Sequence, residues 1–321
     1  MKKVLILIGE LSDSAAPDEL DVLRQARVVE EELINSGYNT SRAFMGTDLG
    51  KTLRVIERSE ADIVFNLVES IGGKAELIHI APALLKSVPV PFTGSGPEAM
   101  MNTSNKVVAK RIMEMAAIPT PRFIITGDQT RKASGRYIIK PILEDASVGI
   151  NDDSIVEGDI PAKLSLVSIK SYRQVFAEEY IAGREFNLSV IAGKNGPVVL
   201  PPAEIIFRDF PEGKPEIIGY NAKWDESSFE YNNTIRSFEF DRADALLLEE
   251  LKEISLSCWR VFGLNGYARV DFRVNESGKP FVLEVNANPC ISPDAGFYAA
   301  TLQAGMSFGE VIERILADTS V

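Results

Sequence analysis

The chain has 321 residues and a formal net charge of −12, and 45% of its residues are hydrophobic. This length exceeds what one small core needs, so we expect two or three domains. The acidic balance argues against nucleic acid as a partner, because phosphate-backbone binding requires clustered lysines and arginines. It does not exclude a nucleotide site, for which a few local lysines are enough.

The cysteines and the start of the chain bear on its cellular location. Cys258 and Cys290 are too few for a disulfide framework, which favours a reducing compartment. The apolar run Val4–Ile8 is too short for a signal sequence or a membrane span, and no later segment reaches about 18 uninterrupted apolar residues. We therefore expect a cytoplasmic protein that has no membrane partner.

The first part of the chain alternates between predicted strands and helices. Strands are expected at Val4–Ile8, Tyr38–Phe44 and Asp62–Val68, with helices after Pro17 and over Leu53–Arg58. The apolar stripe of the first helix is predicted to contain Leu20, Leu23, Val28, Leu33 and Ile34. The alternation predicts a doubly wound parallel sheet, whose ligands bind beyond the carboxyl ends of the strands. Gly9, Glu10 and Glu69 lie at that edge.

The middle of the chain contains two lysines whose positions bear on ligand binding. Phe92–Pro97 is a predicted loop before two short helices, and Lys106 lies in the second helix. Lys140 ends the apolar strand Arg136–Pro141, where a charge is costly unless it is paired or faces a ligand. The small residues of Glu144–Gly149 follow, and their backbone N–H groups suit phosphate oxygens. This segment lacks the Gly-Lys-Ser/Thr of a Walker loop, and an ordinary hairpin turn is the alternative.

The next segments alternate between apolar strands and polar loops. A strand is expected at Gln174–Tyr180, followed by Ile-Ala-Gly-Arg-Glu-Phe, and Val198–Phe207 reads as a strand pair. Arg208–Ser237 is a long polar loop, which in a compact domain is either functional or disordered. An amphipathic helix is predicted over Arg242–Phe262, and another over Phe308–Leu316.

Ala268–Pro289 is predicted to be a hairpin with a Gly-containing turn. Because side chains alternate along a strand, Arg269, Asp271 and Arg273 share one face, and Glu284 and Asn286 share a face of the second strand. The opposite, apolar side of the second strand is predicted to carry Phe281, Leu283 and Val285. The oxygen ligands Asp271, Glu284 and Asn286 suit Mg²⁺ or Mn²⁺. The alternative is an edge hairpin whose polar face lies in water.

The pattern Arg-x-Asp followed by Glu-x-Asn-x-x-Pro resembles the metal hairpin of the ATP-grasp superfamily, and the D-alanine–D-alanine ligases are the most similar branch. Phe-Thr-Gly-Ser-Gly at residue 92, Glu-Glu-Tyr-Ile-x-Gly-x-Glu-Phe at residue 178 and Tyr-Asn-Ala-Lys-Trp at residue 220 are similar to other segments of that family. The resemblance implies a mixed α/β ATP-grasp fold with an N-terminal doubly wound parallel sheet. The expected domains are 1–95, 96–175 and 176–321, with the lid in the second.

The resemblance also implies roles for individual residues. It implies metal binding by Asp271, Glu284 and Asn286, and catalysis by Arg269 and Lys223. Within the adenine segment, Glu178 and the backbone of residues 179–181 would face adenine, and Glu185 would bind the ribose. The complete set implied for nucleotide binding is Lys106, Lys140, Ser147, Val148, Gly149, Glu178, Glu179, Tyr180, Ile181, Glu185 and Lys223.

The implied activity is an ATP-dependent ligation of a carboxylate to an amine through an acylphosphate, with amino acid or peptide substrates and a homodimeric state that is common in the family. The departures from the family pattern fall on the amino-acid pockets. Residues 9–15 replace a glycine-rich loop, Glu69 replaces a histidine, and Cys290 and Ala295 replace a glycine and a serine. We therefore expect the same chemistry on substrates that need not include D-alanine.

The sequence is less consistent with three other interpretations. A protein that binds ATP without ligating is the main alternative, and the intact metal set argues against it. A dehydrogenase is disfavoured, because the first strand ends without Gly-x-Gly-x-x-Gly. A nucleophilic Cys290 is disfavoured, because no histidine lies near it in the sequence.

Overall fold

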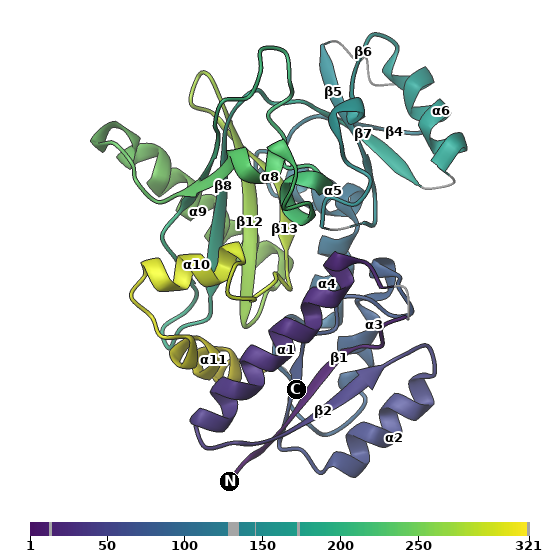
Figure 1. The fold of residues 1–321 in the computed structure, drawn as a ribbon, viewed down its shortest axis with the longest axis vertical. Coiled ribbons are helices and arrows are strands. Elements are labelled where there is room, and N and C mark those ends of the chain that lie inside the picture. Colours follow the sequence, from purple (N-terminus) through teal and green to yellow (C-terminus); the bar gives the residue numbers. More distant parts are fainter. Residues whose placement is uncertain (13–14, 128–134, 145, 172–173, 320–321) are drawn as a thin grey trace.

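The computed structural model describes residues 1–12, 15–127, 135–144, 146–171 and 174–319. Within these ranges, three β-sheets follow one another along the chain (Figure 1). The first sheet lies at one end of the molecule, the large third sheet forms its middle, and the small second sheet lies at the opposite end beside the third.

The N-terminal sheet is parallel, as predicted. It contains β1 (Lys3–Gly9), β2 (Asn39–Met45) and β3 (Ile63–Asn66) in the order β2-β1-β3. Helices α1 (Pro17–Asn35) and α2 (Leu49–Ser59) are the crossovers. The even-numbered residues of β1 pack in a core with α1 and the odd-numbered ones in a core with α2, so the sheet is covered on both faces.

The predicted apolar face of α1 was wrong in part. Leu20, Leu23 and Ile34 are 48%, 38% and 56% exposed. The face that packs on β1 is formed by Val22, Ala26, Val29 and Leu33, which are spaced at three and four residues. The predicted set contains spacings of five residues, from Leu23 to Val28 and from Val28 to Leu33, which do not stay on one face of a helix, whereas the buried set has the helical period.

Short helices connect the first sheet to the second. They are η1 (Ala75–Leu77), α3 (Ile80–Leu85), α4 (Pro97–Ser104) and α5 (Lys106–Met115). The second sheet is antiparallel, in the order β4-β7-β5-β6, and α6 packs against it. Its elements are β4 (Phe123–Ile125), β5 (Arg136–Pro141), η2 (Asp152–Ser154), β6 (Ile155–Glu157), α6 (Ile160–Ser171) and β7 (Val175–Glu179).

The third sheet is built around β8, which pairs antiparallel with β9, β10 and β12. Its strands are β8 (Gly183–Ile191), β9 (Val198–Val199), β10 (Ala203–Phe207), β11 (Thr234–Ser237), β12 (Tyr267–Asn275) and β13 (Pro280–Asn286). Helix α9 (Ala245–Phe262) covers one face, where Leu251, Cys258 and Phe262 share a core with β8 and β12. A short helix, η3 (Arg242–Asp244), precedes α9. The strands predicted as a pair over Val198–Phe207 each pair with β8 instead.

The predicted polar loop Arg208–Ser237 is more ordered than its composition indicates. It contains α7 (Tyr220–Trp224), α8 (Phe229–Asn233) and β11. Because β11 pairs with β10, the segment extends the third sheet and brings α7 and α8 close to the second sheet (Figure 1).

The C-terminal helices return to the first sheet. Helices α10 (Gly296–Gln303) and α11 (Phe308–Ala317) contribute Phe297, Val311 and Ile315 to the core that contains β1 and α1. In Figure 1, α11 lies beside α1. The segment between β13 and α10 therefore lies between the first and third sheets. Among the residues that the structure describes, no helix combines the length and apolar character that crossing a membrane would need.

Candidate active site

A cavity of about 1010 Å³ is lined by residues from all three sheets. Every residue to which the sequence assigns a role lines this cavity. Gly9 and Glu69 lie at its end beside the first sheet, beyond the carboxyl ends of β1 and β3, as expected for such a sheet. The structure thus brings the implied nucleotide, metal and catalytic positions together in one place.

The hairpin β12–β13 forms one wall. Asp271 lies opposite Glu284, and Arg269 lies opposite Asn286. Arg269 donates two hydrogen bonds to Asp271, through Nε at 2.7 Å and Nη2 at 2.8 Å, and Asn187 Nδ2 donates a third at 2.8 Å. These bonds hold the carboxylate of Asp271 in the cavity wall.

The prediction that Phe281, Leu283 and Val285 form the apolar side of the second strand was wrong in part, because the register of the hairpin is irregular. Asp271 pairs with Glu284, but Phe272 pairs with Val282, so Leu283 is an extra residue in a β-bulge. The bulge shifts the alternation, and the buried core side carries Val282 and Val285. Leu283 turns into the cavity, whereas Phe281 is half-buried, with the ammonium group of Lys279 5.1 Å from its ring centroid.

Cations surround the carboxylate of Glu284. Burial alone would raise the pKa of Glu284, but Lys106, Lys223 and Arg269 outweigh it and lower the pKa to about 2. Burial lowers the pKa of Lys223, and the charge of Arg269 lowers it further, against the opposing effect of Glu284. Glu284 is therefore ionised at neutral pH, and the cavity concentrates positive charge beside it.

The candidate metal ligands are two carboxylates and an amide. Asn286 Oδ1 accepts a hydrogen bond from the backbone N–H of Asn288 at 3.0 Å, and Asp271 is bonded to Arg269. The carboxylate of Glu284 accepts no hydrogen bond from any residue that the structure describes. An ionised, unsatisfied carboxylate beside two further oxygen donors fits a hard divalent cation. The described residues contain no group of three or more His, Cys, Asp or Glu side chains that could bind a metal.

Two lysines pair with the buried carboxylate of Glu178, which also lines the cavity. Lys140 Nζ lies 2.7 Å from Glu178, and Lys110 pairs with the same carboxylate. Lys110 is 1% exposed, and its Nζ also donates to Thr120 Oγ1 at 2.9 Å. Lys106 donates to the backbone oxygen of Glu144 at 2.5 Å. Lys110 was not among the predicted site residues, although its place one helical turn after Lys106 on the packed face of α5 was a usable signal.

The loop of residues 146–149, which the family resemblance places in the lid, has an unusual backbone. Ala146 and Ser147 have φ values of 54° and 61°, and Gly149 has 78°. Left-handed conformations are uncommon for residues other than glycine and concentrate at functional sites. Ser147 Oγ donates to Ile218 O at 2.8 Å and Trp224 Nε1 donates to Ala146 O at 3.1 Å, so the segment before β11 holds this loop.

The segment joining β7 to β8 passes along the cavity. The backbone N–H groups of Glu179 and Tyr180 donate to Arg122 O and Arg136 O, at 2.8 and 2.9 Å. The carboxylate of Glu179 accepts two hydrogen bonds from the side chain of Arg122. Among residues 179–181, the N–H of Ile181 is therefore the one left for a ligand within the described part of the chain.

Arg273 and Gly183 fix the start of β8. Arg273 pairs with Glu185 at 2.8 Å and donates to Gly183 O at 2.8 Å. Gly183 has a φ of 128°, and a Cβ there would lie 2.2 Å from Val274 O, so only glycine fits. Burial raises the pKa of Glu185, against the opposing charge of Arg273.

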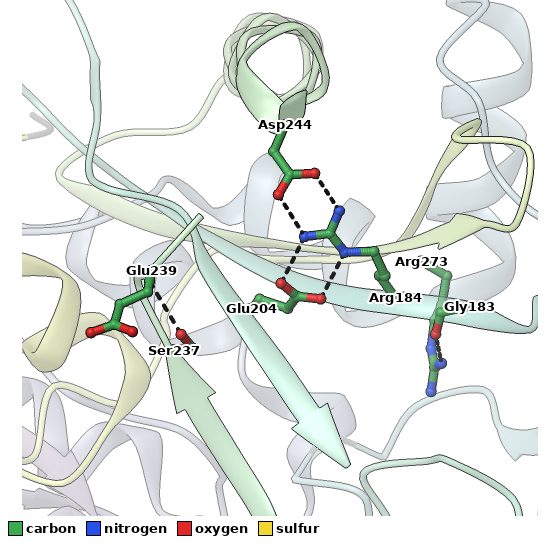
Figure 2. Close-up of polar contacts among 7 residues, drawn as sticks. All are labelled: Gly183, Arg184, Glu204, Ser237, Glu239, Asp244 and Arg273. Atoms are coloured by element: carbon green, nitrogen blue, oxygen red, sulfur yellow. Dashed lines mark hydrogen bonds and ion pairs between the residues drawn. The ribbon is translucent and has the colours of Figure 1, made fainter. Parts of the chain in front are cut away.

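Arg184 anchors the same strand from outside the cavity. Figure 2 shows its guanidinium between two carboxylates, with Nε 2.7 Å from Glu204 Oε1 and Nη1 2.5 Å from Asp244 Oδ1. These pairs tie β8 to β10 and to the start of α9. They raise the pKa of Arg184 and hold Glu185, the next residue, on the cavity side.

The end of the cavity beside the first sheet is held by bonds between α1 and the segment after β13. Asp21 accepts hydrogen bonds from Cys290 Sγ and Ser292 Oγ, each at 2.9 Å. Gln25 donates to Glu69 at 2.7 Å and accepts from the N–H of Ile291 at 3.1 Å. Two of the departures from the family pattern, Glu69 and Cys290, are therefore each bonded to α1. Residues 13 and 14, which belong to another departure, lie outside the described residues.

The thiol of Cys290 is held in its protonated form. Burial raises its pKa well above the usual value, and the negative charges of Glu69 and Asp21 raise it further. A thiolate is the reactive form of cysteine, so this environment agrees with the expectation that Cys290 is not a nucleophile.

A parallel N-terminal sheet followed by two antiparallel sheets, which together enclose one cavity lined with lysines and carboxylates, defines an ATP-grasp enzyme. The family model described as D-ala D-ala ligase C-terminus matches residues 129–317. The chain thus belongs to the D-alanine–D-alanine ligase family.

Named relatives and solved structures agree with this family. The D-alanine–D-alanine ligase of Aquifex aeolicus is 31% identical over 320 residues, which cover 98% of this chain and 99% of the relative. A ligase of the same name from Synechococcus sp. (strain JA-3-3Ab) is 29% identical and covers 92% of each chain. The crystal structure of the Bacillus anthracis ligase has a TM-score of 0.75 at 21% identity, covers 99% of this chain and 97% of that chain, and shares the fold.

These findings confirm the predicted fold and class. The chain is an ATP-dependent, ADP-forming ligase of the ATP-grasp fold, and the non-ligating alternative is not favoured. A structure of the Bacillus anthracis ligase complexed with ATP has a TM-score of 0.74 to this chain. The roles of individual residues stay predictions.

Proposed function

We propose that this ligase joins the carboxylate of one amino acid to the amine of a second amino acid or short peptide. The observation that carries the proposal is the convergence of every implied nucleotide, metal and catalytic residue on one cavity. The cavity has room for ATP and a small substrate together, since its volume is about 1010 Å³.

Nucleotide binding is proposed for the wall formed by the second sheet and α5. Lys106, Lys140 and Lys223 neutralise the phosphates, and the backbone of Ser147, Val148 and Gly149 donates to phosphate oxygens. Adenine lies against Glu178 and the N–H of Ile181, and Glu185 binds the ribose. The left-handed backbone at Ser147 and Gly149 supports this role for the lid loop.

The proposed metal ligands are Asp271, Glu284 and Asn286, which would hold Mg²⁺ or Mn²⁺. When bound, the cation supplies charge neutralisation at the phosphates. The ionised, unsatisfied carboxylate of Glu284 supports this assignment.

The chemistry proceeds in two steps. A substrate carboxylate oxygen attacks the γ-phosphorus of ATP, so that ADP leaves and an acylphosphate forms. The amine of the second substrate then attacks the acyl carbon, inorganic phosphate leaves with the C–O bonding pair, and the nitrogen loses a proton. Arg269 bonds Asp271 through Nε and Nη2, which leaves Nη1 to stabilise the tetrahedral oxyanion, an effect of about 3 kcal/mol for one donor.

We further propose that D-alanine is not a required substrate. The relatives are named for D-alanine, but this chain has Glu69, Cys290 and Ala295 where the family pattern has histidine, glycine and serine. Polar groups of a pocket discriminate strongly between substrates. A homodimeric state, a cytoplasmic location and domain limits at 1–95, 96–175 and 176–321 remain part of the proposal.

The proposal is tested by an ADP-release assay over a panel of D- and L-amino acids, with mass spectrometry of the condensed products. The wild-type protein should release ADP with at least one pair, and Lys140→Met and Asp271→Asn should abolish that release. Turnover at the wild-type rate in either variant would refute the assigned roles. Tight ATP binding with no ADP across the whole panel would favour the non-ligating alternative.

A further inference from the structure

Arg236 lines the cavity. It belongs to none of the motifs, and the proposed two-step chemistry assigns it no role. It lies on β11, opposite Ile205 of β10, and its side chain lines the cavity together with Arg269, Asp294 and Gly296. It stands at the end where the chain departs from the family pattern. Its place in the long polar segment before α9 gave no signal in the sequence.

The guanidinium of Arg236 is not in an ion pair with any acidic side chain that the structure describes. It makes no hydrogen bond with any described side chain either. Asp294, the acid whose charge acts on Arg236, pairs with Arg24 at 2.8 Å. An arginine stays protonated throughout the neutral range, so this is a permanent positive charge that is open to a ligand.

The surroundings of Arg236 leave a defined space in front of it. One side of the Arg236 side chain faces the cavity, so the residue is exposed. The protein on its other side removes part of its hydration. Burial lowers the pKa of Arg236, and the charge of Arg269 lowers it further, against the opposing effect of Asp294. A Cβ at Gly296 would lie 3.5 Å from Nη2 and 3.8 Å from Cζ, so the guanidinium lies alongside this glycine.

A second polar atom points to a ligand at the same place. Thr234 lies two residues before Arg236 on β11 and lines the same cavity. Its Oγ1 is buried and has no hydrogen-bond partner among the described residues. Buried hydroxyl groups are normally satisfied, so an unsatisfied one beside an unpaired guanidinium indicates a missing polar partner.

We propose that Arg236, with the hydroxyl of Thr234, binds the carboxylate of the amine substrate and thereby selects an amino acid or peptide with a free carboxyl group. The proposal rests on the proposed function, in which a second substrate attacks the acylphosphate. A guanidinium can bind a carboxylate through two parallel hydrogen bonds, and Ala295 provides no side-chain hydroxyl for this task. The negative charges of Glu69 and Asp21 nearby would otherwise repel such a substrate.

A competition experiment tests this inference. The enzyme receives ATP, one amino acid, and the carboxamide of the same amino acid at equal concentration, with D-alanine, L-alanine and glycine as the three probes. The carboxamide cannot be phosphorylated and competes only as the amine. Mass spectrometry gives the ratio of dipeptide to dipeptide amide, which reports the choice of amine substrate and does not depend on enzyme concentration or ATP affinity.

The wild-type enzyme should favour the free carboxylate over the carboxamide, and Arg236→Gln should lower this preference by about 10- to 100-fold. Arg236→Lys should retain part of the preference, since it keeps the charge, and it provides the measurement if the glutamine variant does not fold. Arg208→Gln is the matched control, because Arg208 is exposed, follows β10 and does not line the cavity.

The possible failures are distinguishable. An unchanged product ratio in Arg236→Gln, or a wild-type enzyme that uses both amines equally, would overturn this inference and leave the ligase function standing. A wild-type enzyme that forms neither product nor ADP with any probe would contradict the proposed function for these amino acids, and the inference would fall with it.

Discussion

The two ends of the cavity are built in different ways. At the end proposed to bind the nucleotide, called the nucleotide end below, the charged residues lie in short segments and pair with one another, as Lys140 and Lys110 do with Glu178. At the amino-acid end, contacts such as Asp21 to Ser292 and Gln25 to Ile291 join residues more than 260 positions apart. Sequence motifs therefore describe the first end well and the second end poorly.

This difference has a functional consequence. The nucleotide end serves the same ATP in every member of a family, whereas the amino-acid end must match a particular substrate. In this chain, the second end contains an unpaired Arg236, a protonated Cys290 and a carboxylate at Glu69. Substitutions at the first end should thus affect stability and phosphoryl transfer, and substitutions at the second end should affect substrate choice.

The largest expected effect is on stability at the nucleotide end. Lys110→Met removes one of two cations from a carboxylate that is 1% exposed, and it should lower the free energy of unfolding by about 3–5 kcal/mol. Chemical denaturation measures this change. Lys252→Met, which breaks an exposed pair with Glu249, should cost less than about 1 kcal/mol. Equal effects of the two substitutions would show that the buried pair carries no special weight.

The next effect is on phosphoryl transfer. Lys223 lies in the cavity with Glu284 and Arg269, and Lys223→Met should lower kcat by about 10²- to 10³-fold. The thermal midpoint should change little, because Lys223 makes no hydrogen bond with any described residue. Lys194→Met, at an exposed position, serves as the control. A kcat within twofold of wild type would remove Lys223 from the catalytic set.

A smaller effect tests the glycine at the start of β8. Gly183→Ala places a Cβ 2.2 Å from Val274 O, whereas Gly196→Ala, at a φ of 115°, meets nothing within 4 Å. Both substitutions carry backbone strain, so their difference isolates the steric clash, which we expect to cost about 1–3 kcal/mol more at Gly183. The comparison uses thermal unfolding, and a larger loss at Gly196 would contradict it.

The smallest effect concerns Cys290 at the amino-acid end. Because burial and nearby carboxylates raise its pKa, alkylation by iodoacetamide at pH 7 should be slower than for the unfolded chain. Its rate should keep rising above pH 8.5, where an ordinary thiol is already half ionised and begins to level off. Rapid labelling at pH 7 with a plateau by pH 8 would instead indicate an activated thiolate.

Some features of the fold and of the candidate site could be predicted from the sequence, and others could not. Strand β5 and Lys140 at its end could be predicted, because an apolar run that ends in lysine is a local signal. The convergence of Asp271, Glu284 and Asn286 followed from strand alternation. The bulge at Leu283 could not be predicted, because alternation assumes a regular register that only the pairing with β12 reveals.

Other features depended on tertiary contacts with no local signature. Arg236 lies in a polar segment whose composition does not distinguish a surface arginine from one that lines a cavity. Such residues become recognisable only when their partners, or the lack of partners, are known.

The most direct test of the central claim is a crystal structure with Mn²⁺ and a non-hydrolysable ATP analogue, in which anomalous scattering locates the metal. We expect Mn²⁺ between the triphosphate and the oxygens of Asp271, Glu284 and Asn286, with adenine against Ile181. Metal bound elsewhere, with these three side chains free of both cation and phosphate, would contradict the account.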